Sequence, residues 1–187
     1  MSALLGEVLS RRSHSAVTAE APARAELLPL VAAAARVADH ASLRPWRLIE
    51  LRGDDRVALG DALVQAAGLE GPAAAKLAAK PLRASLLIGL VACRRQSEKV
   101  PAWEQDATAA GVAHLFSLLL EQAGWGVMWR SGPHTRSLPV RRLHGLAEDE
   151  ELLGWLYVGG IPETTKPIKR QPVDPEAFLT GLPASAA

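Results

Sequence analysis

A run rich in tryptophan and glycine constrains this chain more than any other stretch. It follows directly on a long apolar helical pattern and reads Gly124-Trp125-Gly126-Val127-Met128-Trp129-Arg130-Ser131-Gly132. We predict a strand over 124–130, in which glycine marks a bulge or a close approach of the backbone to another group. The indoles of Trp125 and Trp129 would supply flat walls, and Arg130 and Ser131 would add a cation and a hydroxyl. A planar anionic ligand against this backbone explains all of these choices, and a core strand with space-saving glycines is the alternative.

The composition is that of one soluble globular domain, which we predict to span 1–187. The 187 residues are 49% apolar and 22% charged, enough for a core without disulfide or metal staples. The 21 basic and 20 acidic residues leave a net charge of +1, which gives no reason to expect nucleic acid as a partner. Cys93 is the single cysteine, so an intrachain disulfide and a cysteine-based zinc cluster are excluded.

Nothing in the sequence predicts export or membrane insertion. The N-terminal residues lack the basic region and the long apolar region of a signal peptide. No stretch approaches the roughly 20 consecutive apolar residues of a membrane-spanning helix. We therefore expect a cytoplasmic protein.

Hydrophobic spacing predicts an α+β fold with helices against an open sheet. The run 84–93 is almost continuously apolar, which is typical of a central strand covered on both faces. The segment 103–123 carries a broad apolar stripe and belongs in the core. Five prolines favour an extended tail over 161–187. The other expected helices cover 4–9, 27–38, 57–67, 73–80 and 135–144, and the other strands cover 46–52 and 152–158.

Several common sites are excluded by their missing signatures. The pair Gly124-x-Gly126 lacks the third glycine of a dinucleotide fingerprint and follows a helix rather than a strand. The sequence holds no P-loop motif, and Ser131 and Ser137 have no nucleophile elbow around them. The five histidines include no i, i+4 pair, so no metal site is expected.

Arginines gather at the ends of the expected elements. The guanidinium fork suits phosphate better than a lysine does, and Ser13 would add a hydroxyl donor beside the first pair. Each arginine alone is also explained as a solvated surface charge or a helix cap. Together with the tryptophan and glycine run, they outline a flavin mononucleotide (FMN) site. The arginines are Arg11, Arg12, Arg36, Arg44, Arg47 and Arg130.

Four stretches and a final strand carry a resemblance to a known family. They are Arg11-Arg12-Ser13, the segment from Arg36 to Arg47 (RVADHASLRPWR), Lys99 to Gln105 (KVPAWEQ), Trp129-Arg130-Ser131-Gly132 and the strand from Leu153 to Gly159. On these residues the sequence resembles the nitroreductase family of FMN-dependent oxidoreductases, and within it the compact bacterial branch of under 200 residues. The second and fourth stretches together carry the specificity.

The resemblance implies a nitroreductase-like fold, with a central, mostly antiparallel sheet flanked by helices. It implies an intertwined homodimer with FMN at the subunit interface. Arg11, Arg12 and Ser13 would hold the flavin phosphate and ribityl chain. Arg36 and His40 would reach the cofactor of the other subunit. Trp129, Arg130 and Ser131 would line the flavin.

The sequence departs from the family pattern in three places. Arg44 precedes Pro45 where many relatives have glutamine or asparagine, so we expect an added charge near the flavin or its substrate. The last strand ends in Gly-Gly-Ile-Pro rather than Gly-Thr-Pro. A basic residue near the C-terminus closes the phosphate site in larger members, and Lys166, Lys169 and Arg170 stay open as candidates. The full set of expected cofactor-binding residues is Arg11, Arg12, Ser13, Arg36, His40, Arg44, Trp129, Arg130 and Ser131.

The implied activity is hydride transfer from NAD(P)H through tightly bound FMN to a nitroaromatic, a quinone or a similar electron-poor acceptor. No side chain is expected to act as a catalytic acid or base. Two alternatives stay open. One is a different flavin chemistry on the same scaffold, such as flavin fragmentation or azole oxidation, and the other is a non-catalytic flavin-binding protein.

Overall fold

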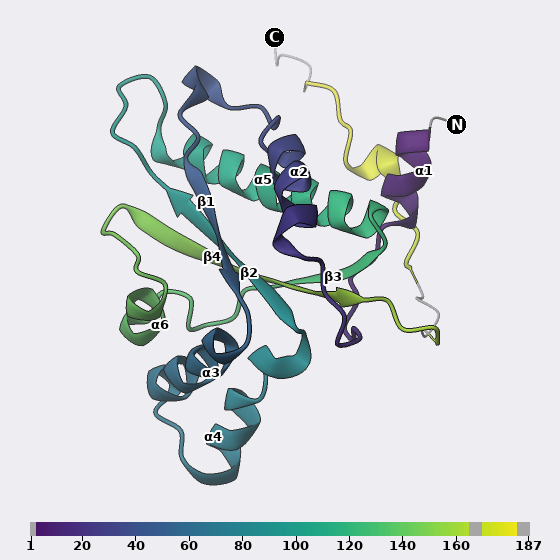
Figure 1. The fold of residues 1–187 in the computed structure, drawn as a ribbon. Coiled ribbons are helices and arrows are strands. Elements are labelled where there is room, and N and C mark those ends of the chain that lie inside the picture. The colour runs from purple at the N-terminus through teal and green to yellow at the C-terminus, as the bar shows by residue number, and fades with distance from the viewer. Residues whose placement is uncertain (1–2, 165–169, 183–187) are drawn as a thin grey trace.

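A four-stranded antiparallel sheet separates two layers of helices in the computed structural model, which describes residues 3–164 and 170–182 (Figure 1). The strand order is β1-β2-β4-β3, and each neighbouring pair is antiparallel. The strands are β1 (Trp46–Leu51), β2 (Leu86–Cys93), β3 (Trp125–Arg130) and β4 (Glu150–Gly160). This arrangement confirms the predicted α+β class with a central antiparallel sheet.

The helices divide between the two faces of the sheet. On one face lie α2 (Arg24–Ala34) and α5 (Ala102–Gln122), with α1 (Ala3–Ser10) beside α5. On the other face lie α3 (Asp54–Ala67), α4 (Gly71–Ala78) and α6 (Leu138–Leu143). The described parts of the chain also hold three short 3₁₀ turns, which cover His40–Ser42, Pro81–Arg83 and Pro175–Ala177. Among the described residues, no helix is both long and apolar enough to cross a membrane.

Two hydrophobic cores form because successive strand residues point to opposite faces. In β2, Leu86, Ile88 and Leu90 pack toward Phe116 of α5. Leu87 and Val91 pack in the other direction, toward α3 and α6. Strand β2 is buried along nearly its whole length, as its continuous apolar run predicts.

A β-bulge interrupts the pairing of β2 with β4. The register shifts between Leu90 and Val91, opposite Gly154, whose φ is +129°. A Cβ atom on Gly154 would lie 2.5 Å from the carbonyl oxygen of Arg130. Only glycine fits there, so the bulge fixes how the end of β3 lies against β4.

Several expected boundaries were wrong. The helix expected at 27–38 runs from Arg24 to Ala34, and the strand expected at 152–158 runs from 150 to 160. The residues beyond the expected range are two glutamates at one end and two glycines at the other, and neither residue type is typical of strands. They form strand nonetheless because both ends find ladder partners on β2 and β3.

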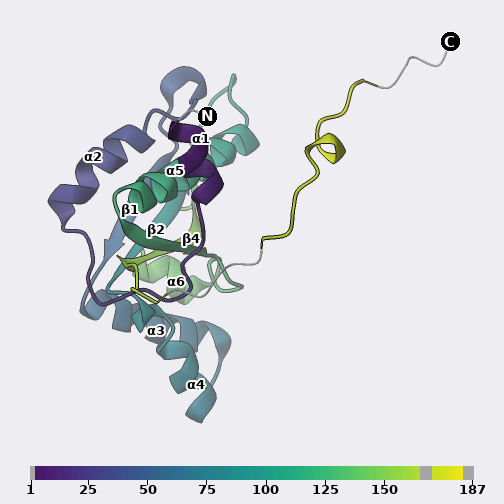
Figure 2. The ribbon, with the colours of Figure 1, turned by 90° about the vertical axis from the view of Figure 1, so that its right-hand side faces the viewer.

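The described part of the tail holds one 3₁₀ turn and otherwise no regular structure, and it leads away from the sheet (Figure 2). Its apolar side chains are strongly exposed, with Phe178 at 80%, Leu179 at 86% and Leu182 at 98%. Arg170 donates to the backbone carbonyls of Leu9, Ser10 and Arg11. Lys166 and Lys169 lie outside the described residues.

Candidate functional site

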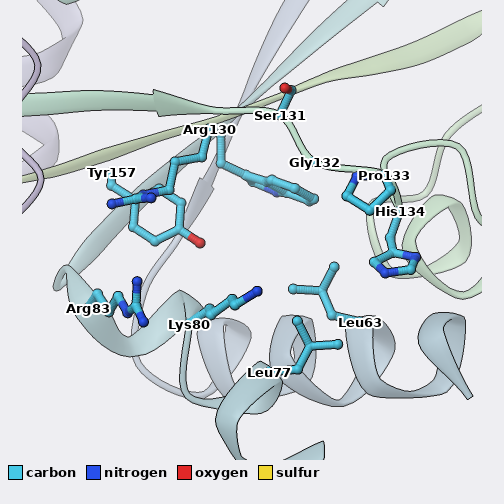
Figure 3. Close-up of a pocket in the computed structure, with 11 residues that line it drawn as sticks. Leu63, Leu77, Lys80, Arg83, Arg130, Ser131, Gly132, Pro133, His134 and Tyr157 are labelled. Atoms are coloured by element: carbon cyan, nitrogen blue, oxygen red, sulfur yellow. The ribbon is translucent and has the colours of Figure 1, made fainter. Parts of the chain in front are cut away.

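A cavity of about 390 Å³ opens between the end of β3 and the helices α3 and α4 (Figure 3). We call it the cationic cavity. Apolar and aromatic side chains from α3, α4 and β4 line one part of it, and basic side chains and the loop after β3 line the rest. Its lining residues are Leu63, Leu77, Lys80, Arg83, Arg130, Ser131, Gly132, Pro133, His134, Trp155 and Tyr157.

The cationic cavity holds positive charge that no acidic side chain balances within residues 3–164 and 170–182. Lys80, Arg83 and Arg130 line it, and among the described residues none of them forms an ion pair. The Nε atom of Arg130 is buried and has no hydrogen-bond partner in the described part of the chain. Since buried polar groups are almost always satisfied, an acceptor atom on a bound ligand would suit this position.

The aromatic wall is tied to the same cations. The guanidinium of Arg130 lies 5.3 Å from the ring centroid of Tyr157, a cation–π distance. Burial raises the pKa of the Tyr157 phenol, against the opposing influence of Arg130 and Arg83. The phenol therefore keeps its proton at neutral pH. An apolar surface bordered by cations suits a flat ligand that carries negative charge at its edge.

A second, smaller cavity of about 210 Å³ lies on the α5 side of β3. We call it the turn cavity, and it brings together four of the nine expected cofactor residues. The backbone N–H of Arg12 donates to both carboxylate oxygens of Glu121, at 2.9 and 3.2 Å, which anchors the turn to α5. The turn cavity is lined by Arg11, Arg12, Ser13, His114, Ser117, Glu121, Val127 and Trp129.

The structure separates Trp129 from Arg130, which we had expected to line one slot. They are consecutive strand residues, so their side chains face opposite sides of the sheet. The indoles of Trp125 and Trp129 pack on the core beneath α5. The aromatic walls beside Arg130 come instead from Trp155 and Tyr157 of β4.

The glycines of β3 and β4 also have another explanation than a bound ligand. A Cβ on Gly126 would lie 3.0 Å from the Cγ1 atom of Val17, and a Cβ on Gly159 would lie 2.7 Å from the Thr18 carbonyl oxygen. The backbone N–H of His14 donates to the Val127 carbonyl at 2.9 Å. The close approach is therefore made by the chain's own segment 14–20, which bonds the free edge of β3 at Val127 and then crosses the sheet face over Gly126 and Gly159 to the end of β4.

That segment connects the two cavities around the edge of the sheet. Arg11, Arg12 and Ser13 line the turn cavity on one face. Two residues after Ser13 the chain has reached the other face, where the Arg130 guanidinium donates to the Ser15 carbonyl at 3.5 Å. A ligand that extends beyond the cationic cavity past Arg130 would meet this segment.

The remaining expected residues lie apart from both cavities. His40 borders a shallow hollow and forms an ion pair with Glu104, its Nδ1 atom 2.9 Å from the carboxylate. Arg36 and Arg44 are exposed. Arg44 belongs to a strained turn with φ of +48°, which the carboxylate of Asp39 holds by accepting the Arg44 N–H at 2.8 Å.

Sequence reasoning missed the residues that supply most of the cationic cavity. Lys80 and Arg83 flank Pro81 after the short helix α4 and carry no motif of their own. Tyr157 and Trp155 lie in the last expected strand, to which we had assigned no site residue. Their two-residue spacing, which places both on one face, was the available signal.

Arg47, noted as a cation at the end of an element, has a structural role instead. Its guanidinium binds the Glu150 carboxylate through two 2.7 Å hydrogen bonds, which lower the pKa of Glu150 to about 2. Glu150 also accepts from the thiol of Cys93 at 3.2 Å. Burial, and then Glu150, raise the pKa of Cys93 to about 12, so this thiol is not a nucleophile.

Glu150→Gln should therefore change the acid stability of the protein. A carboxyl whose folded pKa is depressed stabilises the fold above its unfolded pKa and loses that contribution as the pH falls through the folded value. We expect the variant to lose about 1.5–3 kcal/mol of unfolding free energy at pH 7, with the difference from wild type vanishing between about pH 4.5 and 2. Urea unfolding across this range measures it, with exposed Glu148→Gln as the control. Equal curves for the two variants would contradict the assignment.

The comparisons with known proteins identify the family. The family model described as the nitroreductase family matches residues 8–160. The chain belongs to the nitroreductase family. A relative named "Putative NAD(P)H nitroreductase YdjA" from Escherichia coli K12 is 33% identical over 176 residues, which cover 92% of this chain and 96% of the relative. A "Putative NAD(P)H nitroreductase" of Haemophilus influenzae is 28% identical over 92% and 96% of the two chains.

Solved structures of other proteins share the fold. A nitroreductase-like family protein from Bacillus cereus superposes with a TM-score of 0.78 at 22% identity, over 92% of each chain. The FMN and NADPH-dependent nitroreductase NfnB from sphigopyxis sp. strain HMH superposes with a TM-score of 0.71 at 19% identity, over 91% of this chain and 96% of that chain. Iodotyrosine deiodinase bound to FMN and 3-iodo-L-tyrosine superposes with a TM-score of 0.68 at 16% identity, over 91% of this chain and 96% of that chain. The predicted nitroreductase family and fold, and the general assignment as an oxidoreductase, are confirmed.

Proposed function

We propose that this nitroreductase-family protein is an FMN-dependent oxidoreductase that takes hydride from NAD(P)H and passes it to an electron-poor acceptor, such as a nitroaromatic or a quinone. The observation that carries the proposal is the cationic cavity, whose apolar wall is bordered by cations without acidic partners among the described residues. The names of the relatives agree with it: NfnB is FMN and NADPH-dependent, and the Escherichia coli relative is named for NAD(P)H.

The residues of the cavity fit the group. Bound flavin would supply the hydride chemistry itself. Arg130 has an unsatisfied buried Nε atom that requires an acceptor, and Lys80 and Arg83 add positive charge at the same opening. These cations would hold the electron-rich edge of the ring system and favour its reduced, anionic form. Leu63, Trp155 and the other apolar walls would exclude water.

The phosphate is proposed to lie on the Arg-Arg-Ser turn. Arg11 and Arg12 offer guanidinium groups and Ser13 a hydroxyl, all bordering one cavity. The turn and the cationic cavity lie on opposite faces of the sheet, and the contact of Arg130 with Ser15 links them around the edge of β3. Arg170 closes against the backbone of the same turn, because it donates to the Arg11 carbonyl. Of the three basic tail residues, Arg170 is therefore the one we propose to reach the phosphate.

We further propose a homodimer, with Arg36, His40 and Arg44 contributing to the partner's site. In their own protomer, Arg36 and Arg44 are exposed, and His40 pairs with Glu104 away from both cavities. Exposed apolar side chains on α1 and on the tail support an interface, since monomers rarely expose so many together. Light scattering with FMN present should give twice the 19.8 kDa chain mass, and a monomer at micromolar concentration would contradict the dimer.

The decisive experiment is the visible spectrum of the purified protein during turnover. We expect a yellow protein that stoichiometric NAD(P)H bleaches and that menadione or a nitroaromatic restores. Donor and acceptor would share one flavin face, so double-reciprocal plots should be parallel. A colourless protein that binds no added FMN would contradict the proposal. Bound flavin that neither NADH nor NADPH reduces would favour one of the alternatives, a passive flavin carrier or another flavin chemistry.

A further inference from the structure

A buried histidine lies behind the cationic cavity and bonds to one of its walls. His144, at the end of α6, is 6% exposed. The indole N–H of Trp155 donates to its Nε2 atom at 2.9 Å. Trp155 is itself 3% exposed, and it lines the cationic cavity. One side-chain hydrogen bond therefore joins α6 to the cavity wall.

The chemistry of its partners fixes the protonation state of His144. Its Nδ1 atom lies 2.8 Å from the Val140 carbonyl, which can only accept, so Nδ1 carries the proton. The indole of Trp155 can only donate, so Nε2 must present its lone pair. The neutral Nδ1–H tautomer is the one form that satisfies both partners.

The surroundings hold the imidazole in place and disfavour a charge on it. Gly89 of β2 is the cross-strand partner of Trp155, and a Cβ there would lie 3.5 Å from the His144 ring. The ring therefore packs over the sheet beside that pair. Arg47 of β1, paired with Glu150 of β4, donates to the His144 carbonyl at 3.4 Å. Burial, and to a smaller extent Arg47, lower the pKa of His144.

We infer that His144 is a positioning residue, which holds the indole of Trp155 in the orientation that forms the wall of the cationic cavity. Without this acceptor, the buried indole N–H would be left unsatisfied, and the ring would have to turn or admit water to regain a partner. The consequence for cofactor binding rests on the proposed function. The coupling of His144 to Trp155 does not.

The first test needs no flavin. The Trp155 indole N–H signal in a proton–nitrogen NMR spectrum is assigned by its loss in Trp155→Phe. His144→Phe keeps a ring but removes the acceptor, so hydrogen exchange of this N–H should accelerate about tenfold or more. His144→Gln keeps an acceptor and should restore slow exchange. Unchanged exchange in His144→Phe would overturn the inference.

The second test asks whether His144 acts on the cavity through Trp155. FMN dissociation constants are measured for His144→Phe, for Trp155→Phe and for the double variant. We expect His144→Phe to weaken FMN binding about 5–10-fold in the wild-type background and to have no further effect beside Trp155→Phe. An equal loss in both backgrounds would show that His144 acts by another route and would overturn the positioning role.

The two arms separate this inference from the proposed function. A wild-type protein that binds no FMN would refute the proposed function, while the exchange data would still decide the coupling of His144 to Trp155. Should His144→Phe fail to fold, acid removes the same acceptor in the wild-type protein. The protection of the Trp155 indole N–H, which is its exchange rate compared with that of a free indole at the same pH, must then fall as the pH falls through the pKa of His144, and constant protection would refute the coupling.

Discussion

Gly154→Ala should cost about 3 kcal/mol or more of unfolding free energy. Two penalties add at this bulge. The φ of +129° is a conformation that L side chains rarely adopt, and the new Cβ would lie 2.5 Å from the Arg130 carbonyl and 2.9 Å from the Ser131 Cα. Because both contacts are backbone atoms, the end of β3 would have to move.

The matched control is Gly124→Ala. Gly124 also has a positive φ, of +89°, but no atom lies within 4 Å of its ideal Cβ position. Gly124→Ala should therefore lower the unfolding free energy only by the cost of the strained backbone conformation, about 1–2 kcal/mol. Denaturant unfolding measures both variants. Equal losses would mean that the close contact beneath Arg130 is not the source of the difference.

Arg130→Ala should weaken FMN binding by about 10–100-fold while leaving the fold intact. A hydrogen bond to a charged group contributes about 1.5–3 kcal/mol, and this guanidinium has an unsatisfied Nε aimed at no protein acceptor among the described residues. Its contact with Ser15 is long, at 3.5 Å, so little of the fold depends on it. Flavin fluorescence titration gives the dissociation constant.

Arg142→Ala serves as the control, because Arg142 is an exposed arginine of α6 that lines neither cavity. It should bind FMN as the wild type does. If Arg130→Ala kept wild-type affinity as well, the flavin would have to be placed elsewhere, and the turn cavity would become the primary site. Reduced affinity in both variants would indicate a general effect of net charge.

The sequence predicted the architecture better than the site, for a physical reason. Local sequence patterns predict strand β2, through a continuous apolar run, and helix α5, through a broad apolar stripe. The Arg-Arg-Ser turn and Trp129 were expected to share a site, and the structure places them around one cavity. Contributions from elements distant in the chain, such as Lys80 just after α4, leave no local pattern.

The separation of the Trp129 and Arg130 side chains follows from a rule that needs only the sequence. Trp129 and Arg130 are adjacent in a strand, so alternation alone predicts that they face opposite sides. From the family resemblance we expected Trp129, Arg130 and Ser131 to line the flavin together, and we did not apply the alternation of strand side chains to them. Gly126 misled in a different way, since its small size accommodates Val17, and no local pattern could reveal that the partner was the chain itself.

The attachment of segment 14–20 to β3 and β4 has a consequence for solubility. An open sheet exposes unpaired backbone groups at its edges, where another chain can add as a strand. Here, the His14 N–H donates to Val127 at the free edge of β3, and the Thr18 N–H donates to Gly160 of β4, so segment 14–20 is tied to both strands. The same segment begins at the turn proposed to bind phosphate, so a ligand held there would also keep the edge closed. Loss of cofactor would then expose unpaired backbone groups at the edge of β3. The empty protein would therefore aggregate more readily than the loaded one.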